Sequence, residues 1–238
     1  MKNKKFVPIL YAFLAAVFYA INTPLSKLLL TNVAPTFMAA FLYLGAGCTV
    51  GILYIFHYKK ETKEDHLGKK DIPYTIGMIL LDILAPIFLM MGIKYGSASN
   101  ASLLGNFEIV ATSLIALFIF KEKISGRLWI AIALITISSI VLSVNGGESF
   151  NFSYGSLFVL LATCCWGLEN NCTRSISDKS SYQIVVIKGF CSGFGSLIIA
   201  LVLGEQFPQF SYIAATLLLG FVAYGLSIFM YVSAQRDL

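Results

Sequence analysis

Long apolar stretches of similar length recur along this chain, and they restrict its fold more than any other feature. Eight can be marked, at residues 6–30, 35–56, 72–93, 98–120, 128–146, 154–173, 183–204 and 210–233. About 20 apolar residues in an α-helix cross the roughly 30 Å hydrocarbon layer of a bilayer. Because lipid offers no partner to backbone polar groups, such runs must be helical there. The sequence therefore predicts an all-α, polytopic membrane helix bundle.

The composition indicates that the main solvent of this protein is lipid. Of its 238 residues, 58% are hydrophobic and 12% are charged, and the mean hydropathy is +0.80. A soluble domain has about 25% charged residues. The net charge of +5 does not indicate nucleic-acid binding, because the positive residues lie in short loops between the apolar runs. The first run is also too long for a cleavable signal peptide and lacks its cleavage motif.

Lysine and arginine are distributed unequally between the two sets of loops. Of the 17 residues, 14 lie in one set of loops or at the chain ends that belong with it. The other set contains only Lys27 and Lys94, and Lys188 lies inside an apolar run. Loops rich in these residues remain in the cytoplasm, and nothing favours a eukaryotic secretory pathway. We therefore predict a multi-pass protein of a prokaryotic plasma membrane with both termini in the cytoplasm. The fourteen cytoplasmic positions are Lys2, Lys4, Lys5, Lys59, Lys60, Lys63, Lys69, Lys70, Lys121, Lys123, Arg127, Arg174, Lys179 and Arg236.

The sixth run repeats features of the first. At an offset of 147 residues, AVFYAINTPLSK aligns with TCCWGLENNCTR, which places Tyr19 on Trp166 and Lys27 on Arg174. Near the end of the chain, MYVSA also resembles the earlier KYGSA at residues 94–98. These matches occur in the same order, so they indicate an internal repeat.

Glycine motifs in the second and seventh runs support the same repeat. G-x-x-x-G occurs at Gly47 and Gly51 and again at Gly189 and Gly193, nearly at the same offset. Glycine lets helix backbones approach closely, so we predict tight helix contacts at both motifs. The second unit begins five helices after the first. Because five is odd, the second unit enters the membrane from the opposite side and is inverted relative to the first. Inverted repeats are typical of secondary transporters.

The order of segments resembles the EamA-type branch of the drug/metabolite transporter superfamily. The likeness rests on the pairs Tyr19-Ala20 and Trp166-Gly167, each followed by a basic residue at the helix end, and on the stretch 95–125, which is rich in small residues and has the turn KEK near its end. This resemblance implies ten helices in two five-helix inverted repeats. It also implies a secondary active transporter that exports a small metabolite or drug-like molecule by alternating access.

Internal comparison divides the chain into two units. We expect residues 1–147 to form a first EamA-like repeat of five helices, and residues 148–238 a second, incomplete repeat of three. The chain would then have about eight of an expected ten helices, either as a fragment or as a shortened protein. The alternative to a carrier is a non-transporting membrane interaction or assembly protein, or a truncated remnant of a carrier.

Four ionisable residues inside the apolar runs are the main candidates for a functional site: Asp82, Glu108, Glu169 and Lys188. A charge in the membrane interior costs roughly 2.5–3.5 kcal/mol, so such residues usually face a cavity or a partner. We expect Glu108 and Glu169 to face an aqueous central cavity. For Glu169 and Lys188 the alternative is that they pair with each other or reach the interface. The EamA-type family commonly has proline where Glu108 stands, a departure that points to a particular substrate.

Polar and aromatic residues of the two related runs complete the predicted substrate site. Tyr19, Asn22 and Thr23 in the first run and Trp166 and Asn170 in the sixth would lie on opposite sides of a central site. Trp166 and Asn170 are one helical turn apart and would present a stacking surface beside an amide. The alternative for the asparagines is hydrogen bonding between helices as structural support.

Catalytic and nucleotide-binding motifs are absent from the sequence. It contains no G-x-S-x-G, H-E-x-x-H or Walker motif, and His57 and His66 lie in a charged loop away from the buried acids. We predict no enzyme activity, cofactor or metal, although Cys165 and Cys172 could share a helix face as a soft-metal site instead of packing. The predicted partners are a small-molecule substrate, the lipid bilayer and protons as coupling ion, with no nucleic acid and a homodimer left open.

Overall fold

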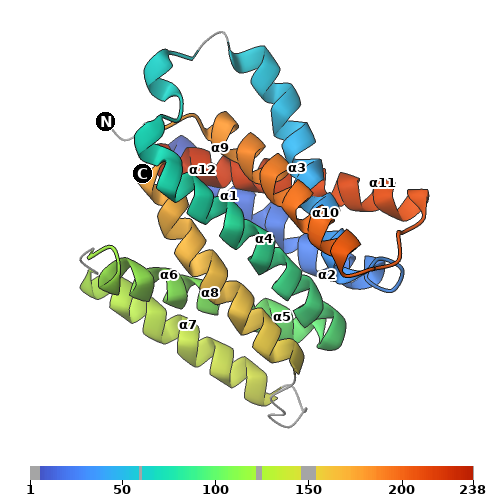
Figure 1. The fold of residues 1–238 in the computed structure, drawn as a ribbon. Coiled ribbons are helices and arrows are strands. Elements are labelled where there is room, and N and C mark those ends of the chain that lie inside the picture. The colour runs from blue at the N-terminus through green and yellow to red at the C-terminus, as the bar shows by residue number, and fades with distance from the viewer. Residues whose placement is uncertain (1–5, 59–60, 122–124, 146–153, 238) are drawn as a thin grey trace.

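The regular elements of the described chain are helices. The computed structural model describes residues 6–58, 61–121, 125–145 and 154–237, and no strand occurs in these ranges (Figure 1). The predicted all-α, polytopic membrane bundle is confirmed. Each of the eight apolar runs corresponds to one helical segment, and several of these segments are divided into shorter elements.

The first half of the chain contains five segments. They are α1 (Phe6–Ala20) with α2 (Asn22–Leu29), α3 (Pro35–His57), α4 (Ile72–Tyr95), α5 (Ala98–Gly105) with α6 (Phe107–Phe118), and α7 (Gly126–Asn145). Two short 3₁₀ turns, η3 (Lys63–Asp65) and η4 (Lys69–Asp71), precede α4.

The second half contains three segments. They are α8 (Tyr154–Ser175), then α9 (Ser181–Ile187) with η5 (Lys188–Ser192) and α10 (Gly193–Val202), then α11 (Phe210–Leu219) with η6 (Gly220–Leu226) and α12 (Ser227–Asp237). Both η5 and η6 are π-helical, which leaves part of the backbone hydrogen-bond ladder shifted.

Length and composition make most of these segments suitable for crossing a membrane. Within the described ranges, six spans satisfy both requirements: Phe6–Leu29, Pro35–His57, Lys69–Tyr95, Ala98–Phe118, Ser181–Val202 and Phe210–Ala234. Over its described part, the fifth segment has a shorter apolar helix, Gly126–Ile137. The sixth segment, α8, is less apolar because it includes Glu169, Asn170, Asn171 and Arg174.

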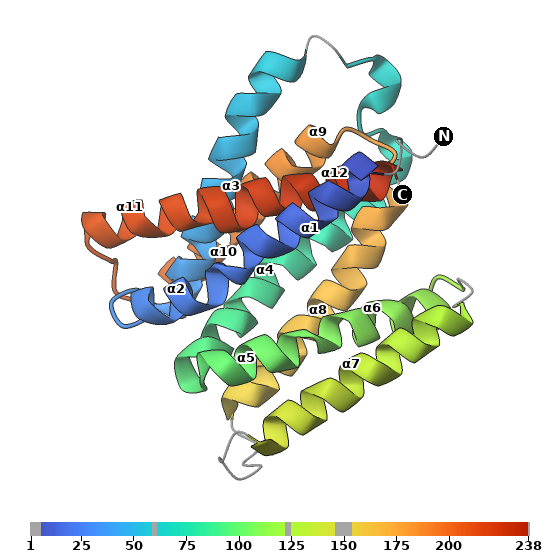
Figure 2. The ribbon, with the colours of Figure 1, turned by 180° about the vertical axis from the view of Figure 1, so that it is seen from behind.

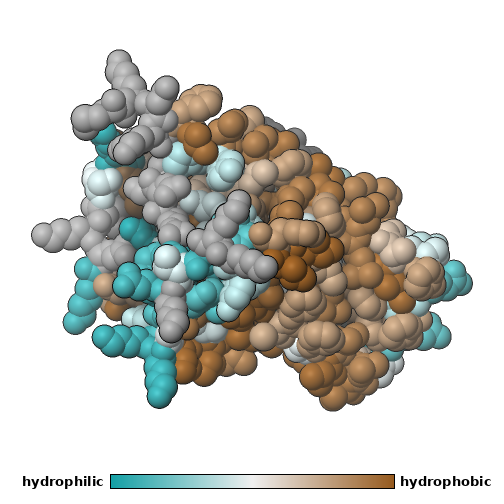
Figure 3. All heavy atoms as spheres, turned by 90° about the horizontal axis from the view of Figure 1, so that it is seen from above, coloured by the Kyte–Doolittle hydropathy of each residue, from teal (hydrophilic) through white to brown (hydrophobic). Residues whose placement is uncertain are grey.

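The outer surface is suited to lipid. Large apolar side chains point outward on several helices: Leu28, Phe56, Phe118 and Val202 are 69–82% exposed. Seen from above, hydrophobic residues cover most of the visible face, while most hydrophilic residues gather at the left of the view and a smaller group lies at the right edge (Figure 3). An apolar surface of this extent must be covered by a bilayer or by other protein.

The helices run between two ends of the bundle. α1 begins and α12 ends at the same end, where α3, α6 and α8 also end (Figures 1 and 2). α2, α4 and α10 end at the opposite end. The first described residue of α1 and the last of α12 therefore lie at the same end of the bundle. Several of the basic residues used to predict the cytoplasmic side lie outside the described residues, namely Lys2, Lys4, Lys5, Lys59, Lys60 and Lys123.

α3 forms the centre of the core. Its residues Phe37, Met38 and Leu42 are fully buried, and it packs against α4, α9, α10, α11, η5 and η6. A Cβ atom added to Gly47 would lie 3.0 Å from the backbone of Gly189, so the backbones of α3 and η5 touch. The predicted close contact is confirmed for this pair of glycines.

The other two motif glycines differ from each other. A Cβ atom on Gly193 would collide with the side chain of Leu44, 2.8 Å away. A Cβ atom on Gly51 would make only an ordinary contact of 3.5 Å with the ring of Phe190. Close approach of the backbones therefore depends on Gly47, Gly189 and Gly193, whereas Gly51 faces the ring of Phe190 at an ordinary distance.

A glutamate from a distant loop caps α3. The backbone N–H groups of Thr36 and Phe37 donate to the Glu205 carboxylate at 3.3 and 3.1 Å, while Ala34 at the N-cap supplies no side-chain acceptor. We expect Glu205→Ala to lower the free energy of unfolding by about 1–2 kcal/mol, because two N–H groups at the helix start lose their partner. Chemical unfolding in detergent measures this. The exposed Glu64→Ala serves as control, and equal losses in the two variants would contradict the capping role.

Candidate functional site

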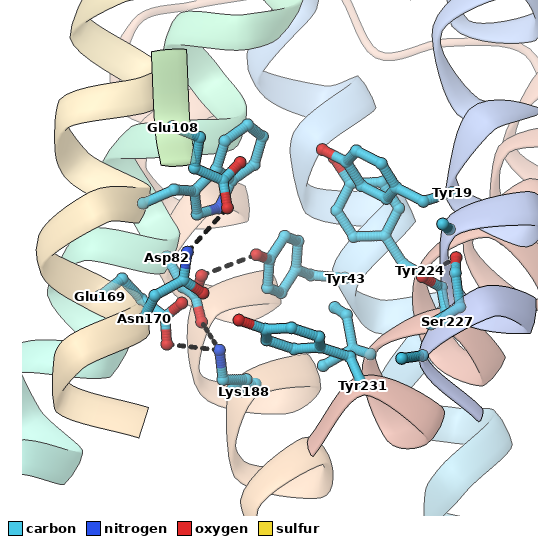
Figure 4. Close-up of a pocket in the computed structure, with 15 residues that line it drawn as sticks. Tyr19, Tyr43, Asp82, Glu108, Glu169, Asn170, Lys188, Tyr224, Ser227 and Tyr231 are labelled. Carbon is cyan, nitrogen blue, oxygen red and sulfur yellow. Dashed lines mark hydrogen bonds and ion pairs between the residues drawn. The ribbon is translucent and has the colours of Figure 1, made fainter. Parts of the chain in front are cut away.

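A cavity of about 340 Å³ lies inside the bundle, between helices from both halves of the chain. α1, α3, α4 and α6 form its walls together with α8, η5, η6 and α12 (Figure 4). Its size lies within the range of roughly 300–1,000 Å³ found for small-molecule sites. The lining residues are Ala12, Ala15, Ala16, Tyr19, Tyr43, Asp82, Glu108, Trp166, Glu169, Asn170, Lys188, Tyr224, Ser227, Ile228 and Tyr231.

Three ionisable groups meet on one side of this cavity. The Lys188 ammonium lies 3.1 Å from a carboxylate oxygen of Asp82 and forms a second ion pair with Glu169 (Figure 4). Tyr43 donates its hydroxyl to Asp82 at 2.8 Å, and Thr173 donates to Glu169. Asp82, Glu169 and Lys188 are 1%, 2% and 4% exposed. The alternative in which Glu169 and Lys188 pair is confirmed, and Asp82 joins the pair.

Glu108 is placed differently. Its carboxylate accepts a hydrogen bond of 2.7 Å from the Asn170 side chain. Within the described residues, no ammonium or guanidinium group lies within 4 Å of it. Glu108 is in the first turn of α6, where the helix dipole favours negative charge. The site thus contains one acid that is held by an amide and a helix end and has no cation beside it.

Aromatic rings form much of the rest of the cavity wall. Tyr19 meets Trp166 edge to face, with ring centroids 6.4 Å apart and an interplanar angle of 81°. The ring centroid of Tyr224 lies 5.7 Å from that of Tyr19 and 5.1 Å from that of Tyr43, with interplanar angles of 51° and 66°. Tyr231 extends into the same space from α12 (Figure 4). The rings therefore surround the space on several sides.

Comparison with known proteins identifies the family. Residues 6–144 match the EamA-like transporter family. The chain belongs to this family. A curated relative from Methanothermobacter thermautotrophicus (strain Delta H), described as an uncharacterized transporter, is 25% identical over 210 residues, which cover 80% of this chain and 60% of the relative. The chain therefore spans 60% of the length of that relative.

A solved crystal structure shows the same fold. It superposes on this EamA-like protein with a TM-score of 0.72 at 16% sequence identity. The match covers 96% of this chain and 79% of that chain. At this identity the likeness concerns the fold alone.

Seven of the nine residues that we predicted to bind substrate line the cavity of this EamA-like protein. They are Tyr19, Asp82, Glu108, Trp166, Glu169, Asn170 and Lys188. Asn22 and Thr23 are not among the lining residues: Asn22 is fully buried and accepts a hydrogen bond of 2.9 Å from Ser26, and Thr23 is half-buried. The role of all nine in substrate binding stays a prediction.

Helix irregularities surround this site in the EamA-like fold. Pro86 lies inside α4 and has no N–H to donate to the carbonyl of Asp82, four residues earlier. Lys188 is the first residue of π-helical η5, and Tyr224 lies in π-helical η6. Such interruptions in helices are frequent at functional sites. The breaks in these two C-terminal segments were not apparent in the sequence.

Sequence reasoning missed three tyrosines of the cavity wall. Tyr43, Tyr224 and Tyr231 all line it, and Tyr43 holds the Asp82 carboxylate. Tyr231 belongs to the repeated MYVSA segment, which was a usable signal. Tyr43 and Tyr224 had none, since a tyrosine in a membrane helix equally suits packing or the interface.

Metal binding finds no support in the described part of the chain. No group of three or more His, Cys, Asp and Glu there could hold a metal ion. All five cysteines are free thiols, with Cys172 buried and Cys165 half-buried.

Proposed function

We propose that this protein is a secondary carrier that exports a small organic molecule across the plasma membrane by alternating access. The observation that carries the proposal is the central cavity, because the four ionisable residues predicted inside the apolar runs all line it. Ionisable residues at this position in membrane proteins usually mark substrate or ion pathways. Membership of the EamA-like transporter family supports the same function.

Contacts between repeat-related residues support two inverted halves, residues 1–147 and 148–238. Tyr19 and Trp166 align in the repeat, and their rings are in contact. Gly47 and Gly189 are the first glycines of the two G-x-x-x-G motifs, 142 residues apart, and their backbones touch. Residues related by a two-fold axis can meet only near that axis. A pseudo-two-fold axis through the middle of the bundle accounts for both contacts and for a site shared by the halves.

An ion gradient is the proposed energy source. The sequence has no Walker motif for nucleotide hydrolysis. Of the three acids that line the described cavity, Glu108 is the one without a cation beside it, so it is the proposed site of proton coupling. α1 begins and α12 ends at one end of the bundle, and the excess of basic residues in the loops supports a cytoplasmic location for that end.

Thiol labelling tests alternating access. Ala12 lies on α1, is half-buried and lines the cavity. In a background without the five native cysteines, we expect Ala12→Cys in proteoliposomes to react with a membrane-impermeant thiol reagent applied to either face. The reason is that a carrier exposes its central site to each side in turn. Mass spectrometry quantifies the labelled fraction.

A matched cysteine controls for non-specific reaction. Ala39 on α3 is fully buried in the core, so Ala39→Cys should remain unlabelled from both faces. Reaction of Ala12→Cys from only one face would contradict alternating access. Labelling no faster than that of Ala39→Cys would show that the cavity is closed to water.

A further inference from the structure

The charges around the cavity do not balance. When all groups are ionised, the described lining residues carry three carboxylates, on Asp82, Glu108 and Glu169, against one ammonium, on Lys188. Lys188 is engaged by two of the acids. Buried charge in a membrane protein normally has a partner of opposite sign. The uncompensated carboxylate of Glu108 therefore favours a positively charged occupant.

The aromatic walls fit the same kind of occupant. Tyr19, Tyr43, Trp166, Tyr224 and Tyr231 line the space, and the measured ring pairs among them meet at interplanar angles of 51–81°. Rings set at steep angles around a space present both faces and edges to whatever occupies it. Aromatic faces attract organic cations through the ring quadrupole, and the attraction is stronger away from water.

The described cavity has no unpaired cationic side chain that could bind an anionic group of a substrate. Among the described lining residues Lys188 is the one cation, and it is 4% exposed. A substrate carboxylate could bind it only by displacing Asp82 or Glu169, which would leave that acid buried and unpaired. Such displacement is costly, because removing one partner from a buried ion pair strongly destabilises the site.

We propose that the cavity binds organic amines in their cationic form, with an apolar or aromatic body and without a carboxylate. The ammonium group lies near Glu108 and Asn170, and the body contacts the aromatic walls around Tyr19 and Trp166. This substrate class rests on the proposed carrier function, since it concerns the same cavity.

Three probes of one skeleton test the charge preference. Phenethylamine, phenylalanine and phenylpropionate share a phenyl ring on a two-carbon chain and are respectively cationic, zwitterionic and anionic at neutral pH. The protein has two tryptophans, and Trp129 is 46% exposed on α7, so Trp129→Phe leaves Trp166 as the fluorescent reporter inside the cavity. Titration of the purified full chain should give a Kd for phenethylamine at least tenfold lower than for either other probe.

A matched pair of glutamate variants locates the charge. Glu108→Gln should weaken phenethylamine binding at least tenfold, and the exposed Glu64→Gln should change it less than twofold. Loss of binding in Glu108→Gln counts only when its thermal unfolding resembles that of the parent protein, and the three-probe comparison does not depend on this variant.

Each outcome decides the inference. Equal or tighter binding of phenylalanine or phenylpropionate would overturn the amine class while leaving a small-molecule site in place. Absence of response to all three probes at millimolar concentration would also overturn it. Failure of the carrier function itself is recognised separately, by an Ala12→Cys thiol that no reagent reaches from either face.

Discussion

Replacing Lys188 with methionine is expected to lower the free energy of unfolding by about 3–5 kcal/mol, the largest loss for any single substitution considered for this protein. Methionine keeps an unbranched chain of similar length but removes the ammonium that joins Asp82 and Glu169. Both acids are at most 2% exposed and would be left unpaired in a low-dielectric core. Denaturant titration in mixed micelles, followed by circular dichroism, measures the loss.

A triple variant distinguishes the effect of the lost charge on stability from the effect of changed packing. Asp82→Asn with Glu169→Gln and Lys188→Met removes all three charges with little change in shape. Replacing a whole buried ionic cluster is often nearly neutral, so this triple variant should recover most of the stability. A Lys188→Met protein as stable as the parent would show that the ion pairs contribute little. A triple variant as unstable as Lys188→Met would attribute the loss to packing instead.

Adding a single methyl group at Gly189 is expected to separate α3 from the seventh segment. A Cβ atom there would collide with the backbone of Gly47 and would lie 2.9 Å from the carbonyl oxygen of Tyr43. Backbone atoms cannot rotate away, so the helices themselves must move apart. We expect Gly189→Ala to cost about 1–3 kcal/mol or more and to reduce the yield of folded protein. Size-exclusion chromatography and denaturant titration in detergent measure both effects.

Gly105 provides the matched control for this substitution. A Cβ atom on Gly105, at the end of α5, would meet no described atom within 4 Å. Gly105→Ala should therefore be neutral or stabilising by up to about 1 kcal/mol, since alanine favours helix more than glycine does. If Gly189→Ala and Gly105→Ala behaved alike, the close approach of the two backbones would not limit folding.

The helical segments were largely predictable, and their internal breaks were not. The run at 35–56 became α3, Pro35–His57, and the run at 154–173 became α8, Tyr154–Ser175. Apolar runs of this length have few alternatives in lipid, which explains the agreement. The turns at Ile21 and Asn106 and the π-helical segments η5 and η6 depend on how neighbouring helices satisfy displaced backbone groups.

The candidate site was predictable to a different degree for acids and for aromatics. Asp82, Glu108, Glu169 and Lys188 stood out because an ionisable group in an apolar run has a high cost that only a cavity or a partner removes. Tyr43 carries no such cost, and its contact with Asp82 depends on the packing of α3 against α4.

The sequence by itself determined that this protein lies in lipid, that it is helical and where its membrane-embedded charges are. These properties follow from single residues and from local periodicity, because transfer into lipid penalises each polar group separately. Only the tertiary structure decided which charges pair. Lys188 is separated from Asp82 by 106 positions and from Glu169 by 19, yet it binds both, while Glu108 has Asn170 instead of a described cation. Pairing depends on how α4, α8 and η5 pack against one another, and no local pattern in the sequence specifies that packing.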